Sequence, residues 1–140
     1  MFEEESEIYK LFISHINGDD EEYDLFLSKL NASYNFQWED CAVRDKISPE
    51  DIKEQMEPVD VVVILSGLVS KDKTLLTRMI DTAKELKKSI VVIRPYGLEN
   101  VPFELEEIAS EVVGWNTPCI VDAIMDSMWF FLETRVYDLF

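Results

Sequence analysis

Short hydrophobic runs alternate with amphipathic stretches along most of the chain. The runs are rich in β-branched residues, and the stretches between them repeat apolar positions at the three- and four-residue spacing of a helix. The pattern predicts strands over Lys10–Ser14, Asn35–Glu39, Val59–Leu65, Ser89–Ile93 and Glu111–Val113. The third and fourth runs are almost continuously apolar, which is typical of central parallel strands covered on both faces.

Predicted helices fill the intervals between these strands. We expect them over Glu21–Leu30, from Ser48, over about Thr74–Lys87, over Glu104–Ala109 and from about Ile120 to the C-terminus. Ser48-Pro49-Glu50-Asp51 has the capping residue, early proline and early acids of a helix start. The last helix is apolar on more than one side, so it either covers the sheet or contacts a second copy of the chain.

The domain organisation predicted from this pattern is simple. No repeat, low-complexity tract or linker divides the sequence, so we expect one domain over residues 1–140. Its core would span residues 9–126, and its C-terminal helix would span about 120–140. The fold class is a doubly wound α/β domain with a five-stranded parallel sheet.

Charge and composition narrow the classes of partner. The chain has 29 acidic and 13 basic residues and a formal net charge of −16, which repels nucleic-acid phosphates and anionic membranes. No apolar run reaches the ~18 residues of a transmembrane helix, and the first residues do not resemble a secretory signal. We therefore expect a cytoplasmic protein without nucleic-acid or membrane partners. Cys41 and Cys119 are expected to be free and buried.

Polar residues that follow the predicted strands are the candidates for a ligand site, because ligands bind at the carboxyl ends of parallel strands. Ser14, His15 and Asp19 follow the first strand, Asp40 the second, Ser66 the third and Arg94 the fourth. The serine hydroxyls would contact a ribose or phosphate, or they would cap turns. The imidazole would contact a ligand, or it would be a hydrogen-bonded linker residue.

Several familiar kinds of site are excluded. The four glycines, Gly18, Gly67, Gly97 and Gly114, form neither a dinucleotide-binding fingerprint nor a phosphate-binding P-loop. One histidine and two separated cysteines argue against a metal site, and we expect no cofactor. A phosphoacceptor receiver domain needs an aspartate at the end of the third strand, where Leu65 and Ser66 stand.

Five segments carry a resemblance to a known family. They are Phe12–His15, Leu65–Val69, Ile93–Pro102, Glu111–Asn116 and Ile120–Ile124. Together they resemble the small prokaryotic TIR-like proteins, which include the TIR component of Thoeris anti-phage defence, and they look closest to stand-alone forms from methanogenic archaea. The resemblance implies a flavodoxin-like three-layer sandwich and adds Phe12 to the ligand-binding candidates. It also implies an NAD-derived nucleotide as ligand and a homo-oligomer or TIR–TIR contact as partner.

The sequence departs from this family at Met79. In active members an aromatic residue and, four positions later, a glutamate stand on the helix after the third strand, and the glutamate assists cleavage of NAD. This chain has Leu75 and Met79 there, and a thioether cannot carry a proton or a negative charge. A positioned acid or base contributes roughly 10²–10⁴-fold to a rate. We therefore lean towards a pseudoenzyme, with Met79 packed in the core.

Three functions remain open from the sequence. The first is a non-catalytic TIR-like domain in signalling or antiviral defence, which acts by protein assembly or by binding a nucleotide. The second is an NAD hydrolase or ADP-ribosyl cyclase that uses an atypical acid, such as Asp19, Glu39 or Asp40. The third is a binder of a nucleoside or flavin, which rests on fold analogy alone.

Overall fold

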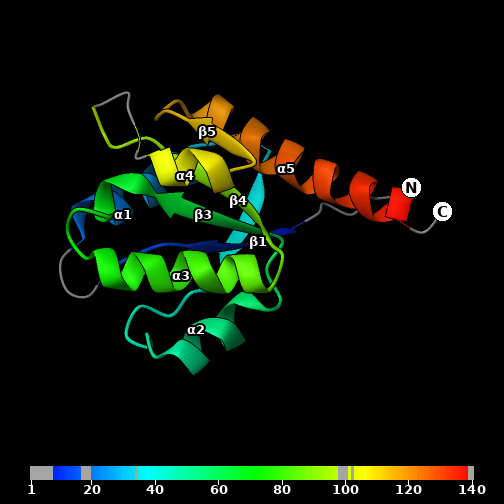
Figure 1. The fold of residues 1–140 in the computed structure, drawn as a ribbon. Coiled ribbons are helices and arrows are strands. Elements are labelled where there is room, and N and C mark those ends of the chain that lie inside the picture. The colour runs from blue at the N-terminus through cyan, green and yellow to red at the C-terminus, as the bar shows by residue number, and fades with distance from the viewer. Residues whose placement is uncertain (1–7, 17–19, 34, 98–100, 102, 139–140) are drawn as a thin grey trace.

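The computed structural model describes the chain except residues 1–7, 17–19, 34, 98–100, 102 and 139–140, and it gives only the backbone for 103 and 129–138. Strands and helices alternate along the whole described chain (Figure 1). The strands are β1 (Ile8–Ile13), β2 (Gln37–Asp40), β3 (Val61–Leu65), β4 (Ser89–Ile93) and β5 (Glu111–Val113). The helices are α1 (Glu21–Asn31), α2 (Pro49–Met56), the short 3₁₀ helix η1 (Ser66–Leu68), α3 (Lys73–Glu85), α4 (Phe103–Ile108) and α5 (Thr117–Asp138).

The sheet has the order β2-β1-β3-β4-β5, and every neighbouring pair is parallel. This confirms the predicted doubly wound α/β fold with five parallel strands. Right-handed crossovers place α1 on one face of the sheet and α2, α3 and α4 on the other, and α5, after the last strand, packs on the face of α1. In agreement with this arrangement, α1 contacts α5 and α2 contacts α3. The long α5 continues beyond the edge of the sheet (Figure 1).

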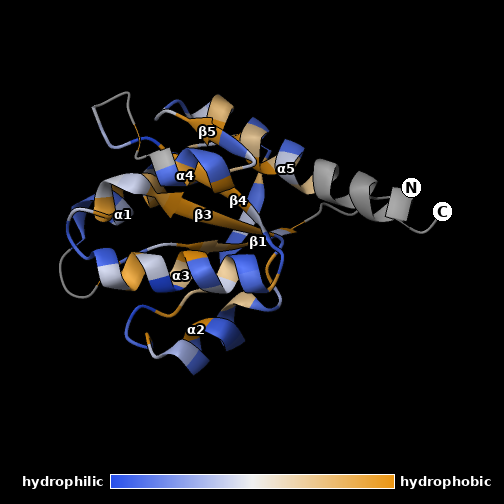
Figure 2. Cartoon of the chain, viewed as in Figure 1, coloured by the Kyte–Doolittle hydropathy of each residue, from blue (hydrophilic) through white to orange (hydrophobic). Residues whose placement is uncertain are grey.

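The core lies between the sheet and its two helical layers. Every residue of β3 and β4 is buried, as their almost continuous apolar sequences predict, and both strands are among the most hydrophobic parts of the cartoon in Figure 2. The helix α3 turns Leu75, Leu76 and Met79 towards this core and keeps hydrophilic residues outside. Helical spacing therefore decides which side of α3 faces the sheet.

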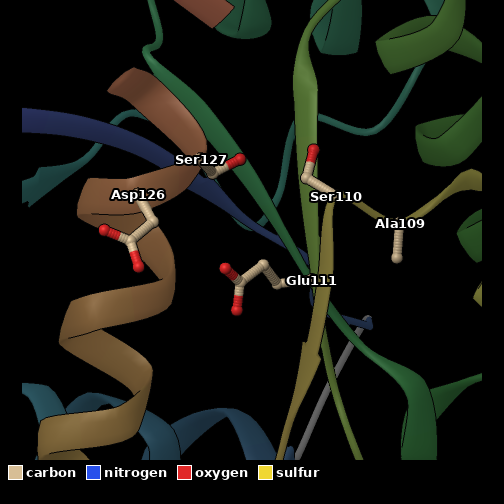
Figure 3. A pocket seen from close by; sticks show the side chains of 5 residues that line it. All are labelled: Ala109, Ser110, Glu111, Asp126 and Ser127. Carbon is tan, nitrogen blue, oxygen red and sulfur yellow. The ribbon is translucent and has the colours of Figure 1, made fainter. Parts of the chain in front are cut away.

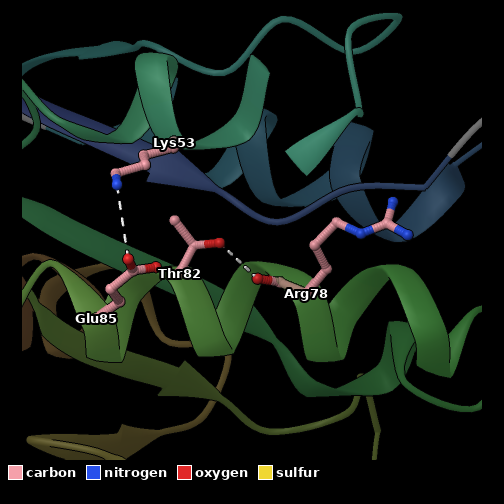
Figure 4. Close-up of polar contacts among 4 residues, drawn as sticks. All are labelled: Lys53, Arg78, Thr82 and Glu85. Carbon is pink, nitrogen blue, oxygen red and sulfur yellow. Dashed lines mark hydrogen bonds and ion pairs between the residues drawn. The ribbon is translucent and has the colours of Figure 1, made fainter. Parts of the chain in front are cut away.

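Polar contacts fix α3 against the segment that includes α2 (Figure 4). Lys53 of α2 lies 3.6 Å from Glu85 of α3, and both side chains are about half exposed, so this ion pair stabilises the contact little. Arg78 donates a hydrogen bond of 3.1 Å to the carbonyl oxygen of Ile47, before α2. Within α3, the hydroxyl of Thr82 donates to the carbonyl oxygen of Arg78 at 2.8 Å.

The structure corrects several local predictions. The second strand spans Gln37–Asp40 instead of Asn35–Glu39, and the third begins at Val61 instead of Val59. The last helix begins at Thr117 instead of about Ile120, because the Asn116 side chain accepts the N–H of Cys119 at 3.1 Å and acts as a cap. The first strand ends at Ile13, so Ser14 lies beyond it. Both cysteines are free, but Cys119 is exposed and Cys41 is only partly buried, so the predicted burial was wrong. Among the helices that the structure describes, none is long and apolar enough to cross a bilayer.

Candidate functional site

The candidate site lies at the carboxyl ends of β1 and β3, where the strand order reverses, and we call this region the crevice. The connection from β1 leads to β2 on one side of the sheet, and the connection from β3 leads to β4 on the other. Ligands of doubly wound domains bind at such a reversal of strand order. The crevice is bordered by Ser14 and His15 after β1, by η1 after β3 and by the first turn of α1.

Both serine candidates are engaged by the backbone. The Ser14 hydroxyl accepts the N–H of Leu65 at 2.8 Å, and the Ser66 hydroxyl donates to the carbonyl oxygen of Ile93 at 2.7 Å. Both serines are buried. Phe12 is buried in β1 and belongs to the hydrophobic core cluster. The two serine hydroxyls tie the ends of β1, β3 and β4 together. The predicted contact of Phe12, Ser14 and Ser66 with a ligand stays untested.

Asp40 is the centre of a hydrogen-bonded cluster at the end of β2. Its carboxylate accepts the Tyr23 hydroxyl at 2.7 Å, the N–H of Ala42 at 3.0 Å and the N–H of Ile13 at 3.3 Å. Burial raises the pKa of Asp40, and the three hydrogen bonds oppose that shift. Burial and the neighbouring carboxylate also raise the pKa of Tyr23. With its oxygens occupied, Asp40 is poorly placed to act on a ligand.

His15 is enclosed in the same cluster and is only 1% exposed. Its ring lies against Phe12 and Tyr23, with centroid distances of 6.1 and 5.9 Å. Nδ1 is 3.1 Å from the carbonyl oxygen of Ile13, which can only accept, so Nδ1 is the protonated nitrogen. Nε2 has no hydrogen-bond partner in the described part of the chain. Burial lowers the pKa of His15 and favours the neutral ring.

The acidic residues near the carboxyl ends of β1 and β2 differ in their contacts and exposure. Asp20 caps α1, because its carboxylate accepts the N–H of Tyr23 and the N–H of Ile16, both at 3.0 Å. Asp19, which was the predicted ligand-binding residue here, lies outside the described residues. Glu39 is exposed on β2, the edge strand of the sheet.

Glu22 is the carboxylate that the sequence analysis missed. It stands in the first turn of α1, and its carboxylate rests against Gly67, where any side chain would collide with it. One oxygen, Oε2, is buried without a partner among the described residues. Burial raises the pKa of Glu22, while Lys71 and a hydrogen bond from the Tyr96 backbone oppose the shift. An acid in a first helical turn is common, so the sequence offered no specific signal.

Glu22 borders a cavity of about 220 Å³ at this end of the sheet. The cavity is also lined by Glu21, Leu25, Lys71 and Tyr96. A carboxylate accepts hydrogen bonds from hydroxyls, an ammonium group binds phosphate, and the Tyr96 ring is 59% exposed and can stack on a planar group. The cavity therefore offers the three kinds of contact that a nucleotide uses.

Arg94, the candidate after β4, belongs to an aromatic cluster beside this cavity. Its carbonyl oxygen accepts the indole N–H of Trp115 at 2.7 Å. The Trp115 ring packs edge-to-face on Tyr96 and Phe26, at centroid distances of 5.2 and 5.9 Å. The Arg94 guanidinium lies next to Gly114, where an added side-chain carbon would be 3.6 Å from it. The cluster thus holds the loop after β4 against α1.

Met79 is fully buried in α3 and belongs to the hydrophobic core cluster. Leu75, Leu76 and Ala83, one turn away on either side, are also buried, and Asp81 is exposed. No carboxylate of α3 therefore shares the buried face with Met79. Within the described ranges, no three His, Cys, Asp or Glu side chains are grouped as they would be to hold a metal ion.

The order of the strands and the position of the crevice define a doubly wound domain of the flavodoxin-like and TIR-like kind. A family model supports the narrower assignment: residues 12–100 match the model of the Thoeris protein ThsB, TIR-like domain. The match covers more than half of the chain, and the chain belongs to this family. A search of curated proteins finds no match.

Proposed function

We propose that this chain is a TIR-like signalling component of antiviral defence that binds an NAD-derived nucleotide and does not cleave it. Family membership supports the link to Thoeris defence. The absence of cleavage is proposed from Met79. This residue is fully buried and has only apolar or hydroxyl neighbours one turn away on α3. Such a helix supplies neither an acid nor a base to a ligand in the crevice.

The cavity beside Glu22 supports nucleotide binding. Glu22 would accept hydrogen bonds from ribose hydroxyls, Lys71 would contact a phosphate, and Tyr96 would stack on a base. The buried oxygen of Glu22 gains a hydrogen bond in this arrangement, which offsets part of the cost of its burial. Ser14, His15 and Ser66 would act by positioning the loops around the cavity.

A thermal-shift series tests the binding proposal. We expect ADP-ribose or NAD to stabilise the protein, by ~2.7 kcal/mol at a concentration of 100 times Kd. Glu22→Gln should weaken this effect, and Asp24→Asn, an exposed acid in the first turn of the same helix that does not line the cavity, is the matched control. The proposal fails if neither nucleotide shifts the unfolding temperature at millimolar concentration.

The second candidate is an enzyme of the same family with an atypical acid. Glu22 favours it, because burial raises its pKa and one of its oxygens has no partner among the described residues, whereas the oxygens of Asp40 are occupied and Glu39 is exposed. Nicotinamide release from NAD distinguishes the two candidates. The proposed function expects none above background, whereas robust release that Glu22→Gln abolishes and Asp24→Asn preserves would establish the enzyme.

Three finer predictions from the sequence stand as proposals without a structural test. They are self-association through α5, a cytoplasmic location and the likeness to stand-alone archaeal forms. The backbone of α5 extends past the sheet, which supports the first of them (Figure 1). Sedimentation of the full chain measures it directly, and a monomer at all concentrations would contradict it.

A further inference from the structure

A second pocket lies at the opposite end of the strands from the crevice, between α5 and the start of β5. Its volume is about 390 Å³, and its lining residues are Ala109, Ser110, Glu111, Asp126 and Ser127 (Figure 3). Ser110 directly precedes β5, and its N–H donates to the carbonyl oxygen of Ile90 near the start of β4. The pocket is therefore at the amino ends of the strands, away from the site described above.

Oxygen atoms dominate the polar lining of this pocket. The carboxylates of Glu111 and Asp126 face the gap between β5 and α5, and the Ser127 hydroxyl points towards Ser110 (Figure 3). Neither carboxylate has an ion pair or a hydrogen bond with another side chain in the described part of the chain. Two such carboxylates on one pocket attract a cation, and the net charge of −16 adds to that attraction.

Ser127 is the independent sign that the pocket is built for a ligand. Its side chain is only 2% exposed, and its hydroxyl oxygen has no hydrogen-bond partner among the described residues. The backbone around it is fixed, because the Ser127 carbonyl oxygen accepts the Ser89 hydroxyl at 3.3 Å. A buried hydroxyl without a partner costs free energy, and a donor in the pocket would remove that cost.

The size and lining of the pocket select the class of cation. A volume of about 390 Å³ is that of roughly a dozen waters at ~30 Å³ each, far more than a bare metal ion fills. Two carboxylates without a third ligating acid also fall short of a typical calcium site. An ammonium group has three donors for oxygen acceptors, and an alkyl chain can pack against Ala109.

We propose that this pocket binds a small aliphatic diamine or polyamine. One ammonium group lies between Glu111 and Asp126 and donates to both carboxylates. The buried Ser127 hydroxyl accepts a hydrogen bond from the amine, and the methylene chain covers Ala109. The site is independent of the nucleotide site, since the two share no residue.

Calorimetric titration of the full chain with 1,4-diaminobutane and spermidine tests the proposal. We expect saturable binding of one molecule, and we expect Glu111→Gln and Asp126→Asn each to weaken it about tenfold, the effect of one lost charge-assisted hydrogen bond. Asp122→Asn, which removes an exposed charge from the same helix outside the pocket, is the matched control. It should leave the affinity within about twofold.

Two results would overturn the assignment. One is equal weakening in Asp122→Asn, which would show that the amine responds only to the overall negative charge. The other is equal binding of Mg²⁺ or Ca²⁺ at matched ionic strength, which would assign the pocket to an inorganic cation. Ser127→Ala provides a second check: it should weaken amine binding without lowering stability, and an unchanged affinity would remove the hydroxyl from the site.

Discussion

The two ends of the sheet use the same polar residue types in opposite ways. At the carboxyl ends of β1, β2 and β3, the oxygens of Ser14, Asp40 and Ser66 are occupied by hydrogen bonds within the protein. At the amino end of β5, Glu111 and Ser127 line a pocket without such partners among the described residues. An oxygen that already has a partner stabilises the fold, and one without a partner is available to a ligand.

This difference separates polar residues that stabilise the fold from polar residues that can bind a ligand. The sequence marks both ends with serines and acids, and position after a strand does not distinguish them. Only the hydrogen-bond partners of each polar atom distinguish the two ends. At the carboxyl end, Glu22 and His15 are exceptions, since Oε2 of Glu22 and Nε2 of His15 are buried without a partner among the described residues. The measurements below test this division, beginning with the largest expected effect.

Met79→Glu should give the largest loss of stability. The side chain at this position is fully buried in the core, and an unpaired charge there costs about 3–5 kcal/mol. Chemical denaturation measures the loss, and Thr77→Glu on the exposed side of α3 is the control, expected to change little. A Met79→Glu protein of unchanged stability would show that the residue faces the crevice, and would reopen the question of catalysis.

Tyr23→Phe and Asp40→Asn should each lower the free energy of unfolding by about 1.5–3 kcal/mol. The Tyr23 hydroxyl donates a hydrogen bond of 2.7 Å to the Asp40 carboxylate, which also accepts two backbone N–H groups. A double-mutant cycle by denaturation measures their coupling, and we expect the double variant to lose less than the sum of the two single losses. Strict additivity would mean that the contact contributes nothing.

A pair of serine variants compares the two ends directly. Ser14→Ala leaves the buried N–H of Leu65 without its acceptor and should cost about 1–3 kcal/mol. Ser127→Ala removes a buried hydroxyl that has no described partner, so its stability should be unchanged or slightly higher. Thermal unfolding of both variants measures the contrast. Equal losses would contradict the division between paired and unpaired oxygens.

His15→Asn should change the pH dependence of stability by a smaller amount. The pKa of His15 is lowered in the folded protein, so below its ordinary value of 6.5 the unfolded chain binds more protons. The contribution of His15 is complete above pH 6.5 and is lost as the pH falls towards the lowered pKa. Denaturation at pH 5.0–7.5 should therefore show the wild type losing stability relative to the variant on acidification. A constant difference would show that the ring titrates normally.

The fold could be predicted from the sequence. Which polar atoms of the site already have a partner within the protein could not. The runs Val61–Leu65 and Ser89–Ile93 place the central strands because burial on both faces leaves an apolar sequence. By contrast, Asp40 becomes occupied only when the Tyr23 hydroxyl reaches it from α1, and Glu22 is significant only through its contact with Gly67. Such contacts join residues far apart along the chain, and no local pattern records them.

Gly67 has no side chain, which leaves room for the Glu22 carboxylate in the first turn of α1. The Glu22 carboxylate lies on that glycine, and further along the same helix the carbonyl oxygen of Lys29 accepts the Thr117 hydroxyl at the start of α5. The helix that carries Glu22 is thus joined by a hydrogen bond to the start of α5. A ligand that shifted α1 would therefore also act on the first turn of α5, the helix that extends past the sheet (Figure 1).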